Sequence, residues 1–129
     1  MYRSPRLCAL NLRIYMINTE LLKGSMATLV LTLLSRKEMY GYDIMKEIEK
    51  ASDQAISVKE GTLYPILHAL EKEEAVEAYW VENSKERRRK YYKITSKGRK
   101  VLKQRKADWD AFKGLIDRLL VTSLQLVNL

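Results

Sequence analysis

The chain has 129 residues, of which 47% are hydrophobic and 31% charged, and a net charge of +8, which fits one folded domain with at most a short appended element. One cysteine, Cys8, allows no disulfide within the chain, and with one histidine it is too little for a His/Cys metal site. No apolar run reaches the roughly 20 residues that span a bilayer, so we expect a cytoplasmic protein with no metal, no cofactor and no membrane partner.

The positive charge is concentrated in one segment. Between Lys85 and Lys106 there are twelve Lys and Arg residues and one acid, Glu86, which gives this segment a net charge of +11. The residues on either side of it are slightly acidic overall. Such a local basic density is typical of a surface that binds a polyanion, and we expect that polyanion to be nucleic acid.

Residues 1–17 are expected to form an N-terminal extension. Two arginines precede a short apolar run, which resembles the opening of a signal peptide. However, Asn11 and Arg13 interrupt that run, and no small-residue cleavage site follows. We therefore interpret the segment as a frayed extension, or as a leader before an authentic start at Met16.

Two helices are predicted next. Apolar residues recur at three- and four-residue spacing over Thr19–Ser35, which also carries a run of small side chains around Gly24. After a polar break at 36–39, a shorter helix is expected from Tyr42 to about Ala51. The small side chains indicate that a neighbouring helix approaches the first one closely.

A third helix is predicted to extend to about Glu74, but the sequence leaves its start open. Ser57 followed by Glu60 matches the capping-box pattern. A start there would place Pro65 in the helix interior, which costs about 3 kcal/mol. We favour Gly61 or Thr62 as the N-cap, because Pro65 then lies in or just after the first turn.

A β-hairpin and a long helix complete the chain. The strands are expected at 76–82 and 90–95, joined by a charged turn over 83–89, and the final helix begins at 95 or 96 and continues to about Leu120 or beyond. Three helices followed by a hairpin predict a mainly α fold, a winged helix-turn-helix with a long C-terminal dimerisation helix. We expect residues 18–95 to form the DNA-binding domain and 96–129 the dimerisation helix.

Four short runs carry a resemblance to a known family. They are Leu21–Ser25, Tyr40–Ile44, Glu60–Leu67 with its Gly-Thr-Leu-Tyr-Pro core, and Arg89–Thr95 followed by Gly98. Together they resemble the PadR family of bacterial transcriptional regulators over roughly residues 18–120. The resemblance implies a dimeric repressor on a palindromic operator, which phenolic acids or multidrug compounds release in some members. The short final helix resembles the smaller subfamily, and members usually start near Met16.

Three groups of residues are candidates for contacts with double-stranded DNA. The hairpin tip is expected to neutralise phosphates; a solubilising loop is the alternative, although a solvated face would mix charge signs. The third helix is expected to enter the major groove, with the alternatives that Tyr64 packs beside Pro65 and that His68 is an inert surface residue. The tyrosines at the start of the second helix either meet a phosphate or pack in the core. The candidates are Lys85, Arg87, Arg88, Arg89 and Lys90 at the tip, Lys59, Thr62, Tyr64 and His68 on the third helix, and Tyr40 and Tyr42.

The apolar stripe of the final helix is expected to be a dimer interface. A helix this long on so small a domain has no partner within the chain along its far half, so a second copy is expected to cover it; packing within the chain is the alternative. Trp109 is a candidate to stack on a small aromatic effector, or it is a plain interface anchor. The expected interface comprises Leu22, Met26, Trp109, Phe112, Ile116, Leu119 and Leu120.

The function predicted from these features is sequence-specific DNA binding by a homodimeric regulator, and the resemblance implies that it is a ligand-responsive repressor. No carboxylate pair, nucleophile–base arrangement or Gly-rich phosphate loop indicates an enzyme. The alternative function is a winged-helix protein–protein adaptor whose basic wing binds an acidic partner.

Overall fold

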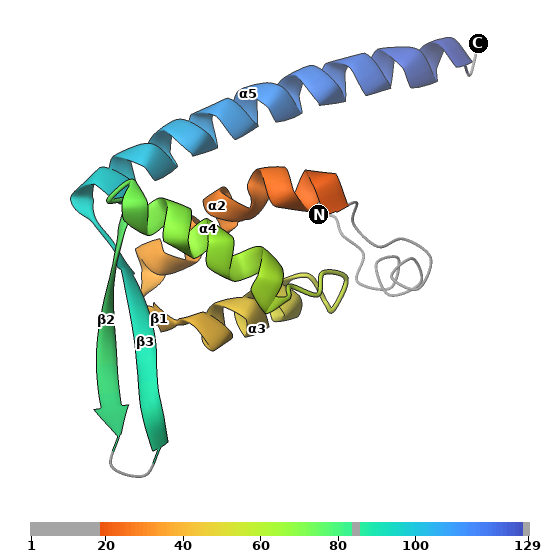
Figure 1. Cartoon of the computed structure of the whole chain (residues 1–129). Coiled ribbons are helices and arrows are strands. Elements are labelled where there is room, and N and C mark those ends of the chain that lie inside the picture. The colour runs from red at the N-terminus through yellow and green to blue at the C-terminus, as the bar shows by residue number, and fades with distance from the viewer. Residues whose placement is uncertain (1–18, 84–85, 128–129) are drawn as a thin grey trace.

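The computed structural model describes residues 19–83 and 86–127, so the expected extension at 1–17 lies outside the described residues. Within these ranges the strands form one antiparallel sheet in the order β1-β3-β2. The arrangement is a winged helix, as the sequence predicts (Figure 1). The elements are α2 (Thr19–Arg36), β1 (Met39–Tyr40), α3 (Gly41–Ala51), α4 (Glu60–Lys72), β2 (Val76–Asn83), β3 (Glu86–Ile94) and α5 (Ser96–Val127).

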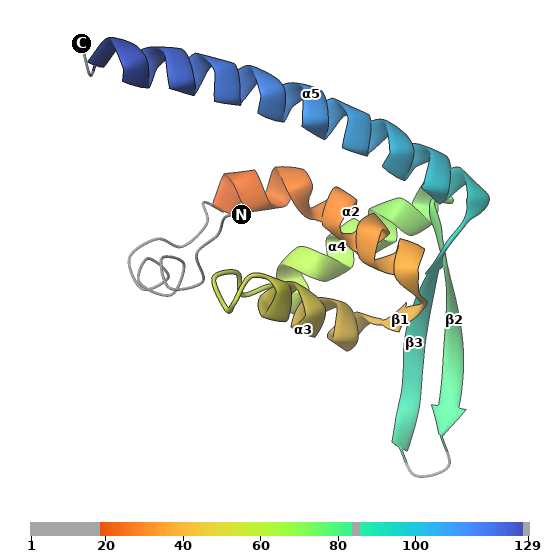
Figure 2. The same ribbon diagram turned by 180° about the vertical axis from the view of Figure 1, so that it is seen from behind.

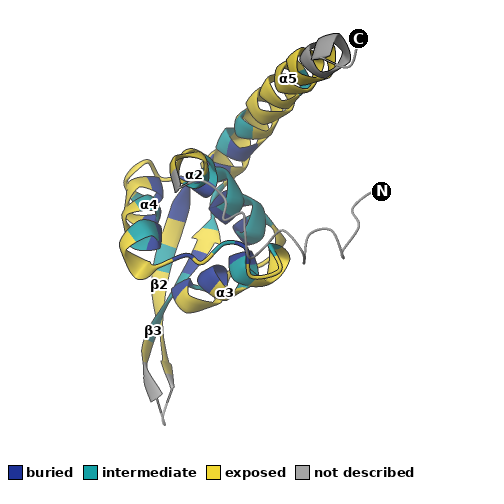
Figure 3. Ribbon diagram, turned by 90° about the vertical axis from the view of Figure 1, so that its right-hand side faces the viewer, coloured by how far each residue is buried: buried dark blue, intermediate teal, exposed yellow. Residues whose placement is uncertain are grey.

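The core lies between α2, α3, α4 and the root of the hairpin. The predicted three- and four-residue spacing places one face of each helix inward, and the sheet closes the core with Met39, Val76 and Tyr92 (Figure 3). The helices contribute Met26, Val30, Leu31, Leu34, Ile44, Met45, Ile48, Leu63, Leu67 and Leu70.

The hairpin and α5 extend from this core in different directions. The tip of β2 and β3 projects from one side of the helical domain, and α5 runs over α2 on the other side and continues beyond it (Figures 1 and 2). Leu102 is the last residue of α5 in the buried core, and the following turns are largely exposed (Figure 3). No helix in the described ranges is long and apolar enough to cross a membrane.

The start of α5 is joined closely to the ends of α4 and β3. Thr95 caps α5, because its Oγ1 accepts a hydrogen bond from the Gly98 N–H at 2.9 Å. The same hydroxyl donates to the Glu74 carbonyl oxygen at 2.7 Å. Gly98 packs directly on the Ala75 backbone, and a Cβ at this position would also lie 2.7 Å from Ile94 Cγ1. The three elements therefore meet at one tightly packed junction.

The favoured start of the third helix is wrong. The helix begins at Glu60 with Lys59 as its N-cap, no side chain caps it, and Pro65 lies within the second turn. Pro65 removes the hydrogen bond to the Gly61 carbonyl, but both residues lie on the exposed face, so water can bond that carbonyl. The helix tolerates the proline for this reason.

The predicted charged turn over 83–89 is also wrong. Arg89 pairs with Val81 and Glu86 with Asn83, so the hairpin ladder extends through residues whose charge suggested a loop. A third strand was not expected: Met39 and Tyr40 pair with Tyr92 and Tyr91. Two residues are too few to show the alternation that identifies a strand.

Glu74 ends α4 in a left-handed conformation, with φ of 64°. The Ala75 N–H donates to the Leu70 carbonyl at 2.8 Å and the Glu74 N–H to the Glu71 carbonyl at 2.9 Å, a Schellman motif in which glycine is usual. We expect Glu74→Gly to raise the free energy of unfolding by about 1 kcal/mol in urea denaturation, because glycine relieves the strain. Glu73→Gly, at a right-handed position, should instead destabilise; a loss of stability in Glu74→Gly would contradict this account.

Candidate nucleic-acid interface

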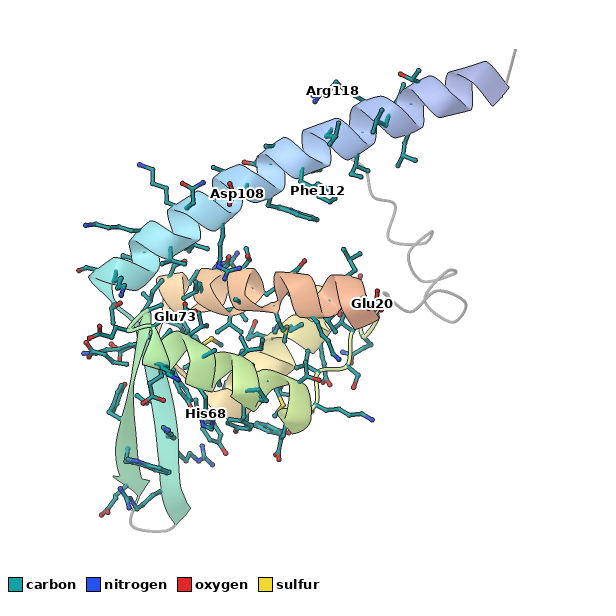
Figure 4. All side chains as sticks on the ribbon, turned by 45° about the horizontal axis from the view of Figure 1, so that its top comes forward. Glu20, His68, Glu73, Asp108, Phe112 and Arg118 are labelled. Carbon is teal, nitrogen blue, oxygen red and sulfur yellow. The ribbon has the colours of Figure 1, made fainter. Side chains whose placement is uncertain are left out.

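The exposed ridge of α4 differs from the predicted outward set. Gly61, Pro65, His68 and Lys72 recur at three- and four-residue spacing and are all exposed. This ridge lies opposite the buried face of the helix, and His68 projects from α4 away from α5 (Figure 4). Lys59, the N-cap, is also exposed. Gly61 and Pro65 add little side-chain bulk to the N-terminal part of this ridge, so the helix backbone there can approach a groove closely.

Thr62 and Tyr64 flank this ridge instead of forming it. Both are half-buried, and burial raises the pKa of the Tyr64 hydroxyl, with smaller effects from Glu60 and the neighbouring tyrosines. The Tyr64 ring lies over Gly41, where an added Cβ would be 2.8 Å from the hydroxyl oxygen. Much of the Tyr64 ring is therefore used in packing that joins α4 to the start of α3, and a contact of its hydroxyl with DNA stays a prediction.

Four tyrosine rings form a row across the outer face of the sheet. Tyr40 is 6.1 Å from Tyr42 and 5.9 Å from Tyr91, and Tyr91 is 5.8 Å from Tyr79, between ring centroids. Tyr42 is exposed and Tyr40 half-buried, and neither is in the buried core. The row therefore connects the N-terminus of α3 to the middle of the hairpin on the solvent side.

Two cations lie on the rings of α3 and β1. The Lys46 ammonium is 5.2 Å from the centre of the Tyr42 ring, and a hydrogen bond with Tyr42 raises the pKa of this lysine. The Arg89 guanidinium is 4.8 Å from the centre of the Tyr40 ring. At the far end of the row, the Tyr79 hydroxyl donates to Glu38, which raises the pKa of Tyr79. Positive charge thus borders the exposed end of the row near the α3 N-terminus.

The basic residues of the wing are divided between the two faces of the hairpin. Alternation along β3 places Arg89 on the outer face, over Tyr40. Arg88 and Lys90 lie on the face that continues from the core, where the Lys90 ammonium is 3.7 Å from the Glu71 carboxylate of α4. Arg87 lies in β3 but its side chain is outside the described part of the structure, as is the whole of Lys85. The predicted cluster is therefore two cationic surfaces.

Three residues on the α4 side of the wing were missed by the sequence analysis. The Arg88 guanidinium is 4.6 Å from the centre of the Trp80 ring, and its Nε is 3.6 Å from Glu82 Oε1. Glu71 pairs with Lys90. Only strand register brings Glu82 and Trp80 beside these cations, so no local sequence signal identified them. In the free protein, both cations of this face, Arg88 and Lys90, are therefore paired with carboxylates.

A second surface lies between α2 and α5. A cleft of about 350 Å³ opens there, and Phe112 projects from α5 toward α2 (Figure 4). The rings of Trp109 and Phe112 are 6.1 Å apart, between centroids. The cleft is lined by Gly24, Ser25, Thr28, Leu29, Arg105, Asp108, Trp109 and Phe112.

The expected dimer residues separate into two groups. Met26 is wholly buried in the core of its own subunit, so its assignment to an interface is wrong, and Leu22 is half-buried against that core. The periodicity of α2 could not distinguish these positions, because both lie on its apolar side. By contrast, the α5 residues are 38–58% exposed: Trp109, Phe112, Ile116, Leu119 and Leu120.

The helix, the hairpin and the charge define a winged-helix DNA-binding protein. A family model described as "Transcriptional regulator PadR-like family" matches residues 30–104. The chain belongs to this family. It is therefore a DNA-binding transcriptional regulator, and the family is not one of enzymes.

Solved structures support the assignment. A transcriptional regulator from Clostridium thermocellum is 36% identical and aligns over 78% of this chain and 97% of its own, with a TM-score of 0.72. A PadR-like transcriptional regulator from Bacillus cereus is 32% identical over 79% of this chain and 97% of its own, with a TM-score of 0.69. An uncharacterized protein of Lysinibacillus sphaericus is 36% identical over 102 residues, 79% of this chain and 94% of that protein.

Proposed function

We propose that the protein is a cytoplasmic, ligand-responsive repressor that binds a palindromic operator as a homodimer. The observation that supports a homodimer is the exposed apolar stripe of α5, where the side chains of Leu119 and Leu120 are 58% and 56% exposed. A second copy that covers this stripe removes large apolar side chains from water. In this proposal residues 18–95 bind DNA and 96–129 pair the subunits.

The mode of DNA binding follows from the α4 ridge and the divided wing. Each α4 enters a major groove with His68 and Lys59 near the bases or phosphates, and Thr62 contacts the groove edge from its flank. The wing contributes affinity through Arg88, Arg89 and Lys90. Two-fold symmetry then places the half-sites one helical turn, about 34 Å, or a multiple of it apart.

The cleft between α2 and α5 is the proposed effector site. Trp109 and Phe112 offer aromatic faces to a flat ligand. Among the described residues, Arg105 has a buried Nε with no hydrogen-bond partner, and this side chain lines the same cleft. An aromatic compound bearing an acidic group fits these features, because the guanidinium can pair with its negative charge.

The effector would act through the orientation of α5. The Thr95 junction couples the start of α5 to the end of α4, so a change in how two α5 helices cross would alter the spacing of the two α4 helices. A ligand can do this only if it binds one spacing more tightly than the other. The proposed ligand therefore weakens operator binding by favouring the wrong spacing.

The function is tested by electrophoretic mobility shift with DNA from upstream of the protein's own gene. We predict that the protein retards one palindromic fragment. Its binding to that fragment should persist when the salt is raised from about 50 to 150 mM, whereas its binding to a shuffled fragment should weaken more. In a reporter fusion to that fragment, deletion of the regulator should raise expression. Weak binding that is uniform across sequences and vanishes at moderate salt would instead favour the protein–protein adaptor.

The dimer is tested by introducing charge into the α5 stripe. We expect Ile116→Lys with Leu119→Lys to convert a dimer of the 15.1 kDa chain into a monomer at micromolar concentration, because two lysines cannot be buried unpaired in an apolar seam. Light scattering after size-exclusion chromatography measures the mass. Asp110→Lys, on another face of α5, is the control and should remain dimeric. A monomeric wild type would overturn the proposal.

A further inference from the structure

Trp80 lies on the side of the hairpin that faces α4, although it is not part of the core. Its side chain is 53% exposed, and its cross-strand partner is Lys90. The Arg88 guanidinium lies 4.6 Å from the centre of the ring and the Lys90 ammonium 5.9 Å from it. The indole is therefore flanked by both cations of this face.

These side-chain contacts form a continuous series from α4 to the distal part of the wing. Glu71 of α4 pairs with Lys90 at 3.7 Å, Lys90 and Arg88 both lie over Trp80, and Arg88 pairs with Glu82 at 3.6 Å. Lys90 also lies 5.6 Å from the centre of the buried Tyr92 ring. Two long, flexible cations are thus kept on the α4 side, while Arg89 lies over Tyr40 on the opposite face.

We propose that Trp80 is a positioning residue for DNA binding, which holds Arg88 and Lys90 ready for the sugar–phosphate strand that passes between α4 and the wing. This inference rests on the proposed mode of DNA binding. Stacking on the indole occupies the face of the guanidinium and leaves its edge N–H groups for phosphate oxygens. Restricting the arginine before binding also reduces the entropy cost of ordering it when DNA arrives. Glu82 and Glu71 are exposed enough to release the cations to a phosphate.

The test is a set of variants measured on the same operator fragment over a range of salt concentrations. Trp80→Ala should weaken operator binding about tenfold for a dimer with two such stacks. Its slope of log affinity against log salt should remain that of the wild type, because the same phosphates are still neutralised. Arg88→Ala should both weaken binding and lower the slope, by about 0.9 for each phosphate that the variant no longer neutralises. Trp80→Phe, which keeps a ring, should recover most of the affinity.

A combined variant shows whether Trp80 acts through the cations. In an Arg88→Ala, Lys90→Ala background, Trp80→Ala should weaken binding no further. Val81→Ala is the matched control, since Val81 is the next residue of β2 and is 40% exposed; it should bind as the wild type does. Circular dichroism and thermal unfolding verify that each variant is folded.

Three results would overturn the inference while leaving the regulator intact. One is wild-type affinity in Trp80→Ala; a second is a tenfold weakening that persists in the background without both cations, which would mean that Trp80 touches DNA directly. Trp80→Phe behaving like Trp80→Ala would also contradict a role for the ring. Failure of the proposed function is distinct from these results, because the wild type itself would then not select the operator.

Discussion

Gly98→Ala should destabilise the protein by about 2–3 kcal/mol, as expected when a methyl group is forced into a packed site. The added Cβ would overlap the Ala75 carbonyl oxygen and lie 2.7 Å from Ile94 Cγ1. The first of these is backbone, which cannot rotate away. Relief would require moving α5 from the end of α4 and breaking the cap that Thr95 Oγ1 forms with the Gly98 N–H.

The measurement is chemical denaturation followed by circular dichroism. Gly61→Ala is the matched control, because Gly61 is also helical but has nothing within 4 Å of an added Cβ. That variant should gain up to about 1 kcal/mol from helix propensity. If Gly98→Ala were as stable as the wild type, the close junction between α4, β3 and α5 would be incorrect, and so would the coupling proposed through it.

Neutralising the wing should have the largest effect on DNA binding. The variant with Arg87, Arg88 and Arg89 changed to alanine should bind about two orders of magnitude more weakly near physiological salt, and its salt slope should fall by about 0.9 for each phosphate left without a cation. The weakening should be similar for operator and shuffled DNA, because phosphate contacts do not distinguish sequences. Fluorescence anisotropy with labelled duplexes at four or five salt concentrations gives both quantities.

A charge-matched variant separates direct phosphate binding from net charge. Lys97, Arg99 and Lys100 are exposed at the start of α5, away from the hairpin tip (Figure 1). Changing these three to alanine removes the same charge and should reduce affinity only slightly, through the long-range field. Equal weakening in the two triple variants would mean that total charge, and not the wing, binds DNA.

The helices and their order could be predicted because each buries one regular face. Leu22 to Leu34 and Leu102 to Leu120 show the three- and four-residue spacing, and their helices are found at the expected positions. The Gly-Thr-Leu-Tyr-Pro run identified the family correctly. Among the helix boundaries, the predicted start of α4 was wrong. Proline is preferred in the first turn of a helix, but here it lies in an exposed second turn that tolerates it.

The details of the candidate site could not be predicted for a different reason. Trp80 and Arg88 become neighbours only through pairing of β2 with β3, and Arg88 and Arg89 separate only because strand side chains alternate. A run of basic residues looks like one cluster until the strand is known. Likewise, Met26 and Leu22 share an apolar spacing, and only the packed core shows that Met26 is fully buried while Leu22 is half-buried.

Mapping the DNA-bound surfaces by directed cleavage tests the central claim most directly, namely that α4 enters the major groove and the wing binds the sugar–phosphate backbone beside it. A Cys8→Ser background removes the one cysteine of the chain, and a cleavage reagent is attached at His68→Cys or Glu82→Cys. We predict cleavage inside each half-site from position 68 and about 5 base pairs, half a helical turn, away from it from position 82. The control reagent at Gln104→Cys on α5 should give no localised cleavage. Cleavage from position 104 equal to that from 68, or the same pattern from 68 and 82, would contradict the account.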